Sequence, residues 1–165
     1  MIHRVLLAVA ATLLLSACTR NAAAPAPAVA PVADSASIVL NFQASAGLNP
    51  GANGAPAPVR VRIFELKNTA NFSRADYFAL AERARTTLGA DLVDQDEVLV
   101  RPGEQLSVER LLDPATRQVG LVVGYREIDQ ALWRSVFNVP PRQVTDYQIS
   151  LDAHAVRSAV ERTAP

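Results

Sequence analysis

Hydrophobic and polar residues alternate with a period of two along several short stretches of this 165-residue chain. In the first such stretch, apolar Ile38, Leu40, Phe42 and Ala44 point one way, which is typical of a half-buried strand. Similar apolar runs occupy residues 59–67, 97–101, 105–111, 118–128, 132–139 and 145–153. About seven short strands separated by frequent turns predict a mainly β protein, an antiparallel β-sandwich.

The second predicted strand carries hydrophobic residues on both of its faces. Val59, Val61 and Ile63 alternate with arginines, but Phe64 and Leu66 then appear on the arginine face. A face that becomes apolar must be covered by another element. We therefore expect a second layer to pack on this strand near residue 66.

One stretch, residues 74–88, has the helical period instead and supplies that layer. The residues that share one face are Tyr77, Ala81, Ala84 and Leu88, with Phe78 alongside. Ser73 is the expected N-cap, with Asp76 three residues on. Gly89 is the expected stop. This predicts one inserted amphipathic helical element at about residues 73–89, broken near Thr86 if at all.

The first 17 residues have the pattern of a lipoprotein signal peptide. Arg4 precedes 11 uncharged residues, 5–15, and a membrane-spanning helix needs roughly 20. The following Leu15-Ser16-Ala17-Cys18 resembles the bacterial lipobox, which implies cleavage before Cys18 and acylation of its thiol and amine. Two or more acyl chains anchor a protein stably. The alternative is an ordinary signal peptide with a chance cysteine, but this is the chain's only cysteine.

Residues 18–36 predict a lipidated N-terminus followed by an Ala/Pro-rich tether of polyproline character, long enough to extend about 50 Å. Thr19 follows the cysteine in place of the Asp that often marks inner-membrane retention, which favours the outer membrane. We expect the sandwich domain to span residues 37–155 and residues 156–165 to form a C-terminal tail.

Residues 45–58 form a long predicted loop. They contain three Gly, three Pro and two Asn, and a loop of this length in a compact domain is usually functional or disordered. Its prolines lower the cost of ordering it on a partner. Leu48 is its one sizeable apolar residue, the expected anchor for a contact, while Asn49 and Asn53 offer hydrogen bonds.

Charge and residue types exclude several functions. The formal net charge is zero and Lys67 is the only lysine, so nucleic acid is not an expected partner. His154 is the only histidine after the signal peptide, and Ser150 is too far along the same strand face for a nucleophile–base pair. We predict a surface histidine and no catalytic residues.

Two further features have a functional and a structural interpretation. The acidic residues Asp91, Asp94, Asp96 and Glu97 could bind calcium, but their spacing lacks the pattern of a calcium loop, so a solvated turn is favoured. Trp133 could stack on a sugar, but its alternation with Phe137 favours a place in the core. No metal or cofactor residue is predicted.

An ordered series of motifs then resembles one known family, the type VI secretion lipoproteins (TssJ or SciN). The series covers residues 37–153 and comprises Leu48-Asn49-Pro50, the run 58–66, Phe72 with 76–78, 88–92 leading to Asp96-Glu97, 101–103, 119–126 and Trp133-Arg134.

The resemblance implies a transthyretin-like β-sandwich with an added helical element and no enzymatic activity. It implies a lipid anchor on the periplasmic face of the outer membrane, with no cofactor beyond the lipid on Cys18 and no small-molecule substrate. The implied protein partner is the periplasmic C-terminal domain of the IcmF-like (TssM) inner-membrane protein. The implied contact is the loop between the first two strands, comprising Ala46, Gly47, Leu48, Asn49, Pro50, Gly51, Ala52, Asn53, Gly54, Ala55 and Pro56.

Two alternatives remain open at this point. A periplasmic ligand- or glycan-binding lipoprotein on a similar sandwich would use an exposed Trp133 or the tyrosines as a stacking platform. A hydrolase would depend on His154.

Overall fold

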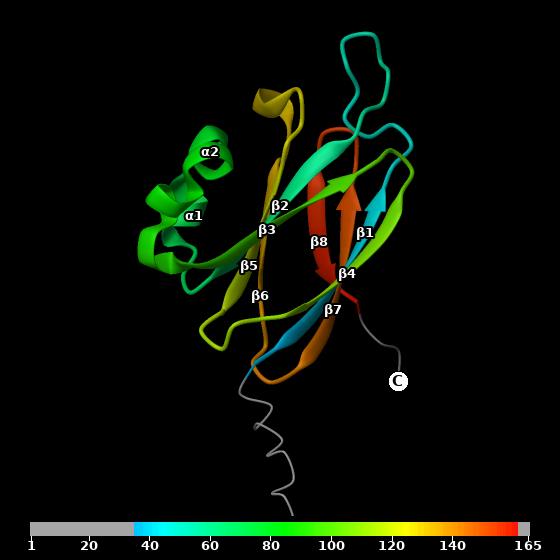
Figure 1. Ribbon diagram of the computed structural model, residues 1–165. Helices are drawn as coiled ribbons and strands as arrows, with labels where there is room; N and C mark the ends of the chain where they lie inside the picture. The colour runs from blue at the N-terminus through cyan, green and yellow to red at the C-terminus, as the bar shows by residue number, and fades with distance from the viewer. Residues whose placement is uncertain (1–34, 162–165) are drawn as a thin grey trace, which may run out of the picture. The chain divides into compact units, whose positions relative to one another are not determined.

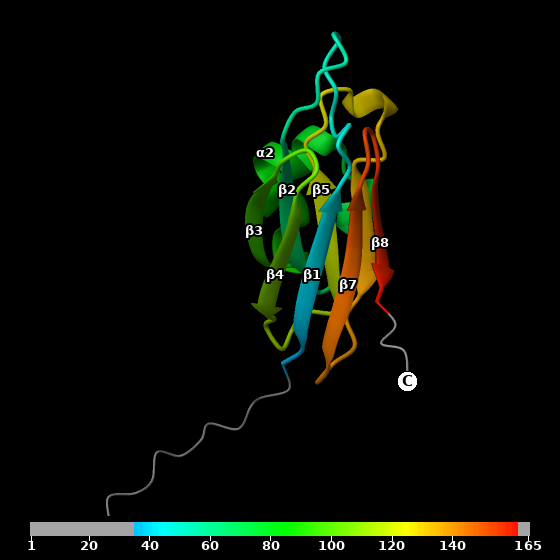
Figure 2. The same ribbon diagram turned by 90° about the vertical axis from the view of Figure 1, so that its right-hand side faces the viewer.

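Two four-stranded sheets pack face to face, and two short helices cover the outer face of one sheet (Figure 1). The computed structural model describes residues 35–161. Sheet A has the strand order β4-β1-β7-β8, and sheet B has the order β3-β2-β5-β6. Figure 2 shows sheet A in front, with the helical layer behind it. The predicted mainly β sandwich with an inserted helical element is confirmed.

Within residues 35–161 the chain forms eight strands, two α-helices and two 3₁₀ turns. Sheet A contains β4 (Gln105–Leu111), β1 (Ser37–Ala44), β7 (Val144–Leu151) and β8 (Val156–Val160). Sheet B contains β3 (Leu92–Val100), β2 (Val59–Leu66), β5 (Gln118–Val123) and β6 (Arg134–Asn138). The helical elements are α1 (Ala70–Arg74), α2 (Tyr77–Leu88), η1 (Gly89–Asp91) and η2 (Ile128–Gln130). In this part of the chain no helix is both long and apolar enough to cross a membrane.

Strand pairing is antiparallel except between β1 and β7, which run parallel. A purely antiparallel sandwich was therefore not quite the right expectation. After β1 the chain crosses to sheet B for β2, the helices and β3, returns to sheet A for β4, and crosses again for β5 and β6. It then returns as β7, which lies beside β1 and runs in the same direction. Parallel neighbours need a long connection, and here the second sheet and the helices provide it.

The period-two pattern predicts the core correctly. Ile38, Leu40 and Phe42 of β1 are buried in the space between the sheets, and they face Val61 and Ile63 of β2. At about 25 cal/mol per Å² of buried apolar surface, this core is the main source of stability, since the described residues contain no disulfide.

The second hydrophobic face of β2 is covered by the helices, as predicted. Phe64 and Leu66 are fully buried against Phe72 of α1 and Leu80 of α2. Phe72 lies directly over Gly120 of β5, where an added Cβ would come within 2.6 Å of its ring. Because Gly120 has no side chain, Phe72 and the helical layer can pack closely against sheet B.

The prediction of a single helix capped by Ser73 was wrong. Ser73 lies inside α1, and Asp76 caps α2 by accepting a hydrogen bond from the Ala79 amide at 2.8 Å. A short acidic side chain is itself a strong N-cap, so it starts a new helix. The irregular residue is Arg83 (φ −130°) and not Thr86. Gly89 ends the helix at positive φ, as predicted.

Two element boundaries also differ from the prediction. β3 begins at Leu92, so the acidic residues 94–97 lie in a strand and not in a turn. Residues 156–160 form β8 and not a tail. Only Val156 of β8 is buried, so this segment has no clear hydrophobic period in the sequence. It becomes a strand because its backbone forms hydrogen bonds with the edge of β7.

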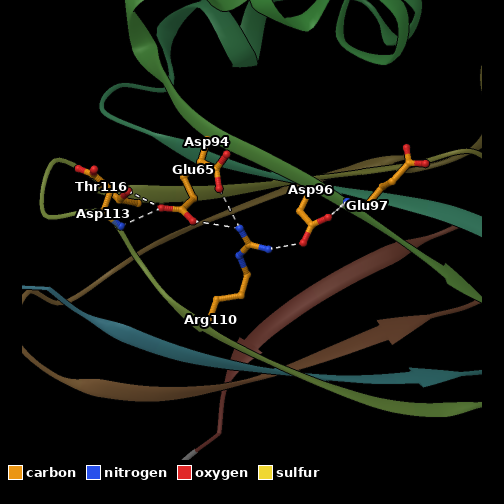
Figure 3. Close-up of polar contacts among 7 residues, drawn as sticks. All are labelled: Glu65, Asp94, Asp96, Glu97, Arg110, Asp113 and Thr116. Carbon is orange, nitrogen blue, oxygen red and sulfur yellow. Dashed lines mark hydrogen bonds and ion pairs between the residues drawn. The ribbon is translucent and has the colours of Figure 1, made fainter.

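Arg110 closes the open side of the sandwich, where the edge strands β3 and β4 lie next to each other (Figure 3). Its guanidinium donates to Asp96 at 2.6 Å, and to Asp94 and Glu65 at 3.2 Å each. Arg110 belongs to sheet A and its three carboxylate partners belong to sheet B, so this one side chain links the two sheets. The pKa of Asp96 is lowered, first by the hydrogen bond from the Glu97 amide and then by Arg110.

Glu65 is the buried member of this network, with 2% of its surface exposed. It faces the space between the sheets, in register with the apolar residues of β2. Its second oxygen accepts hydrogen bonds from the Thr116 hydroxyl at 2.8 Å and the Asp113 amide at 3.1 Å. A buried carboxylate is tolerated only when it is paired and hydrogen-bonded, and both conditions hold here.

We expect Arg110→Met to lower the free energy of unfolding by about 3 kcal/mol, because it leaves the Glu65 charge buried without its cation. Methionine keeps an apolar chain in place of the aliphatic part of Arg110, so the loss of stability measures the effect of removing the charge. Urea denaturation measures it, with Arg101→Met as the control: Arg101 is exposed and pairs with Glu104 at 3.5 Å, which contributes less than about 1 kcal/mol. Equal losses in the two variants would contradict the assigned role.

Candidate functional site

The acidic cluster does not form a metal site in the described part of the chain. Asp94 and Asp96 bind Arg110, and Glu97 lies between two arginines of β2. Asp91 accepts a hydrogen bond from Asn71 at 2.9 Å. Within residues 35–161 no three His, Cys, Asp or Glu side chains gather in a way that could hold a metal ion. Guanidinium groups thus pair with Asp94, Asp96 and Glu97, while Asp91 is held by an asparagine amide.

His154 lies in the turn between β7 and β8, beyond the end of the strand at Leu151. The expectation that it shares a strand face with Ser150 was therefore wrong. Its carbonyl accepts a hydrogen bond from the Leu132 amide at 2.8 Å. The structure thus gives this residue a backbone role in joining two turns.

Trp133 lies at the boundary between the core and the surface. It is partly buried and packs against both hydrophobic clusters, one on each side of sheet B. Tyr77 meets its ring edge-on at 5.6 Å, and the Arg134 guanidinium lies 4.7 Å from the ring centre. The predicted place in the core is confirmed in part.

The loop of residues 45–58 extends from the end of the sandwich opposite to the start of β1 (Figures 1 and 2). Its base is tied to two neighbouring turns. The Ser45 carbonyl accepts from the Gly103 amide at 3.1 Å, and the Ser45 amide donates to Leu151 at 2.8 Å. We refer to this end, with its turns at residues 101–104, 124–133 and 152–155, as the loop end.

Leu48 is not an exposed anchor, contrary to the expectation from sequence. It has 0% of its surface exposed and belongs to the main core between the sheets. After its first turn the loop therefore inserts the Leu48 side chain into the core, and this burial fixes the position of the loop. A single leucine among Ala, Gly and Pro is equally compatible with an anchor buried in the protein's own core. The sequence pattern therefore did not distinguish these two roles of Leu48.

Asn49 holds three segments of the loop end together. Only 3% of it is exposed, and its backbone adopts a positive φ of 49°. Its side-chain amide donates to the Pro58 carbonyl at 3.0 Å, and its side-chain oxygen accepts from the Arg126 amide at 2.8 Å. Its own amide donates to Ala153 at 3.1 Å. Asparagine suits this place because it tolerates the left-handed region and both donates and accepts.

The tip of the loop is a small hydrogen-bonded turn. The Gly51 amide donates to Ala55 at 2.9 Å, and the Gly54 amide donates to Gly51 at 2.8 Å. The Asn53 side chain accepts from the Ala55 amide at 3.1 Å. Of the predicted contact residues, Leu48 and Asn49 are buried and Pro50 and Gly51 are partly buried, while the exposed ones are Ala46, Gly47, Ala52, Asn53, Gly54, Ala55 and Pro56.

The residues beside the loop add charge that the sequence did not assign to this end. Arg126 is exposed, and its guanidinium lies against Gly51, where an added Cβ would come within 2.6 Å of it. Beneath it Tyr125 is buried; burial, followed by the negative charge of Asp152, raises the pKa of its hydroxyl. The loop end thus has an uncharged, preformed tip with the Arg126 cation beside it, and its neighbouring turns carry the exposed acidic residues Glu127, Asp129 and Asp152.

The comparisons with known proteins agree with this architecture. The family model described as type VI secretion lipoprotein, VasD, EvfM, TssJ, VC_A0113, matches residues 36–154. The crystal structure of the lipoprotein TssJ1 from Pseudomonas aeruginosa shares 47% identity and a TM-score of 0.76, over 79% of this chain and 99% of that chain. No curated protein matches the sequence significantly.

Two more distant structures have the same fold. Serratia marcescens Lip, described as a membrane-bound component of the type VI secretion system, shares 25% identity and a TM-score of 0.71, over 76% of this chain and 98% of that chain. A chain of the structure described as the TssM C-terminal domain from EAEC shares 27% identity and a TM-score of 0.64, over 74% of this chain and 97% of that chain. With a family model covering nearly the whole sandwich and 47% identity to TssJ1, this chain belongs to the type VI secretion lipoprotein family.

Proposed function

We propose that this protein is a lipid-anchored structural component of the type VI secretion membrane complex. It binds the periplasmic C-terminal domain of the IcmF-like (TssM) inner-membrane protein and connects it to the periplasmic face of the outer membrane. The observation that carries the proposal is the preformed loop end, which lies opposite to the start of β1. Support for the partner comes from the similar chain in a structure described as the TssM C-terminal domain.

The position of the loop suits a bridge between two membranes. Cys18 and most of the predicted tether lie outside the described residues. Ala36, the predicted last residue of the tether, is instead buried in the core, so the chain enters the sandwich there, just before β1. From there β1 runs eight residues, about 25 Å, toward the loop end. Because the chain enters the sandwich at the end opposite to the loop (Figure 1), an anchor at Cys18 would leave the loop end open to a partner.

The structure of the loop lowers the cost of binding. Leu48 in the core and the hydrogen bonds of Asn49 fix the stem before any partner arrives. A preformed loop loses less conformational entropy on binding than a disordered loop does. The exposed tip has only small or neutral side chains, so it contributes shape and backbone hydrogen-bonding groups, and no large side chain must be ordered.

The glycan-binding alternative loses its main support. Tyr77 occupies the edge of the Trp133 ring and the Arg134 guanidinium lies over it, so the ring is already engaged. Arg134 is itself held by hydrogen bonds to the carbonyls of Phe72 and Ala75, both at 3.0 Å. The groups around the tryptophan thus build the fold, in keeping with a structural and non-enzymatic role.

A charged side chain at the loop tip is expected to block the partner. Ala52→Glu places a carboxylate on an exposed residue, so the fold is unaffected, while affinity for the purified IcmF-like periplasmic domain falls at least tenfold. Isothermal titration calorimetry measures this, with Ala90→Glu in the exposed η1 turn as the matched control. Unchanged affinity in the Ala52 variant would remove the loop from the interface.

Asn49→Ala is expected to loosen the loop from within. It leaves the Pro58 carbonyl and Arg126 amide without their partner and puts alanine at positive φ, which together lower the free energy of unfolding by about 2 kcal/mol. Asn53→Ala, an exposed change in the same loop, costs about 0.5 kcal/mol or less. Chemical denaturation compares the free energies of unfolding of the two variants. An Asn49→Ala variant as stable as the wild type would show that the hydrogen bonds of Asn49 do not hold the loop.

The anchor is tested separately. Cys18→Ala, made with a signal peptide that ordinary signal peptidase cleaves, is expected to give a folded protein in the soluble periplasmic fraction that no longer supports type VI secretion. Fractionation and a secretion assay give the two measurements. Normal secretion by a soluble, correctly exported variant would contradict the bridging role, and membrane retention would contradict acylation at Cys18.

A further inference from the structure

We propose that a pocket between β2, β5 and the start of α2 binds a carboxylate side chain of an acidic segment in a partner protein. This inference rests on the proposed function for the identity of the partner. The pocket has a volume of about 190 Å³ and is lined by Arg60, Arg62, Tyr77, Val122 and Gly124. No motif in the sequence pointed to it, since its residues come from three separate segments.

The pocket exists because the helical layer covers only half of β2. The residues of β2 that face the helices alternate, and the last two, Phe64 and Leu66, are buried beneath α1 and α2. The first two are Arg60 and Arg62, and α2 begins at Tyr77 beside them. The uncovered half of this sheet face thus presents two guanidinium groups beside an aromatic ring.

These two arginines have hydrogen-bonding capacity that the described residues do not use. Their nearest carboxylate is Glu97, at 3.7 Å from Arg60 and 3.8 Å from Arg62. These separations exceed hydrogen-bond lengths of about 2.7–3.2 Å, so Glu97 balances charge without satisfying the N–H groups. With two cations and one anion, the site keeps one net positive charge. Guanidinium groups bind carboxylates through paired N–H donors, which is the chemistry this pocket offers.

Partial burial makes the site stronger than a surface ion pair. The side chain of Arg62 is 26% exposed, against 58% for Arg60, so Arg62 has already lost much of its water. A carboxylate bound there meets a partly desolvated cation, where charge interactions are stronger than in bulk water.

Aromatic side chains border the pocket on the side of α2. Tyr77 packs edge-on against Phe78 at 5.3 Å and against Trp133 at 5.6 Å, and Phe78 is 55% exposed. Aromatic residues and arginine are enriched where proteins bind each other tightly. An acidic side chain flanked by apolar residues would match both the cations and Phe78, which points to a polypeptide ligand.

The pocket is continuous with the loop end. Arg60 is the second residue after the loop, and its carbonyl accepts from the Gly124 amide at 2.9 Å. Two residues further, the Arg126 amide is held by Asn49. A partner seated on the loop therefore reaches the pocket along the same edge. Two arginines fall short of the basic cluster that binds anionic lipid, and the pocket is far from the start of β1.

The first experiment tests the pocket directly. The purified chain carrying Cys18→Ala is titrated with acetyl-Glu-Phe-Glu-amide and, as control, acetyl-Gln-Phe-Gln-amide, while NMR follows the Val122 methyl groups and the Tyr77 ring. We expect saturable shifts with the acidic peptide only, and their loss in Arg60→Gln/Arg62→Gln. Equal shifts with both peptides, or shifts that survive in the double variant, would overturn the proposal.

The second experiment places the pocket in the complex. Arg60→Gln/Arg62→Gln is expected to weaken binding to the IcmF-like periplasmic domain about tenfold or more and to reduce its dependence on salt. Arg85→Gln, an exposed arginine in the last turn of α2, is the matched control and leaves affinity unchanged. Unchanged affinity in the double variant, with normal folding, would overturn the pocket's role while leaving the loop contact intact.

The two experiments separate failure of the pocket from failure of the proposed function. If the wild-type chain does not bind the IcmF-like domain, the proposed partner is wrong, and the peptide titration still decides whether the pocket takes a carboxylate. Phosphatidylglycerol vesicles provide the remaining comparison. Vesicle binding that requires Arg60 and Arg62, without a response to the acidic peptide, would overturn the polypeptide ligand in favour of a lipid surface.

Discussion

Burial of β2 on both faces is the constraint on which the rest of this structure depends. One face, with Val61 and Ile63, fills the space between the sheets, and the other, with Phe64 and Leu66, requires a cover. The helical insertion follows from that requirement, and Gly120 gives it room to approach. Since the helices cover only the second half of the strand, its first half stays open near the loop end. A single packing requirement thus decides both the layer order and the location of the exposed arginines.

On the open side of the sandwich, ion pairs and not apolar packing link the edge strands of the two sheets. Glu65 is directed inward by the same alternation that buries its apolar neighbours in β2, so it needs a cation from the opposite sheet. Arg110 supplies it and also binds Asp94 and Asp96, which keeps two edge strands together that share no backbone pairing. Of the four acidic residues considered in the sequence, Asp94 and Asp96 are thereby accounted for by sheet-to-sheet attachment.

The loop end, where we propose that the partner binds, depends on the same core. Leu48 enters the space between the sheets and Asn49 binds three chain segments, so the loop is an extension of the fold and not an appendage. In the proposed bridge, a rigid tip transmits the position of the sandwich domain to the partner.

The sequence by itself determined the alternating strands, the two-faced second strand and the existence of a long loop, because each depends on local period or composition. The signal peptide and lipobox of residues 1–18 lie outside the described residues and stay a prediction. It failed where a residue's role depends on partners distant in the chain. The pattern predicts an exposed anchor at Leu48, a turn at Asp94 and Asp96 and a tail at 156–165. The structure differs because other segments supply the burial, the opposite cation and the neighbouring strand edge. Tertiary structure alone decided that Arg60, Arg62 and Tyr77 share a pocket, since only the stacking of α2 on half of β2 brings them together.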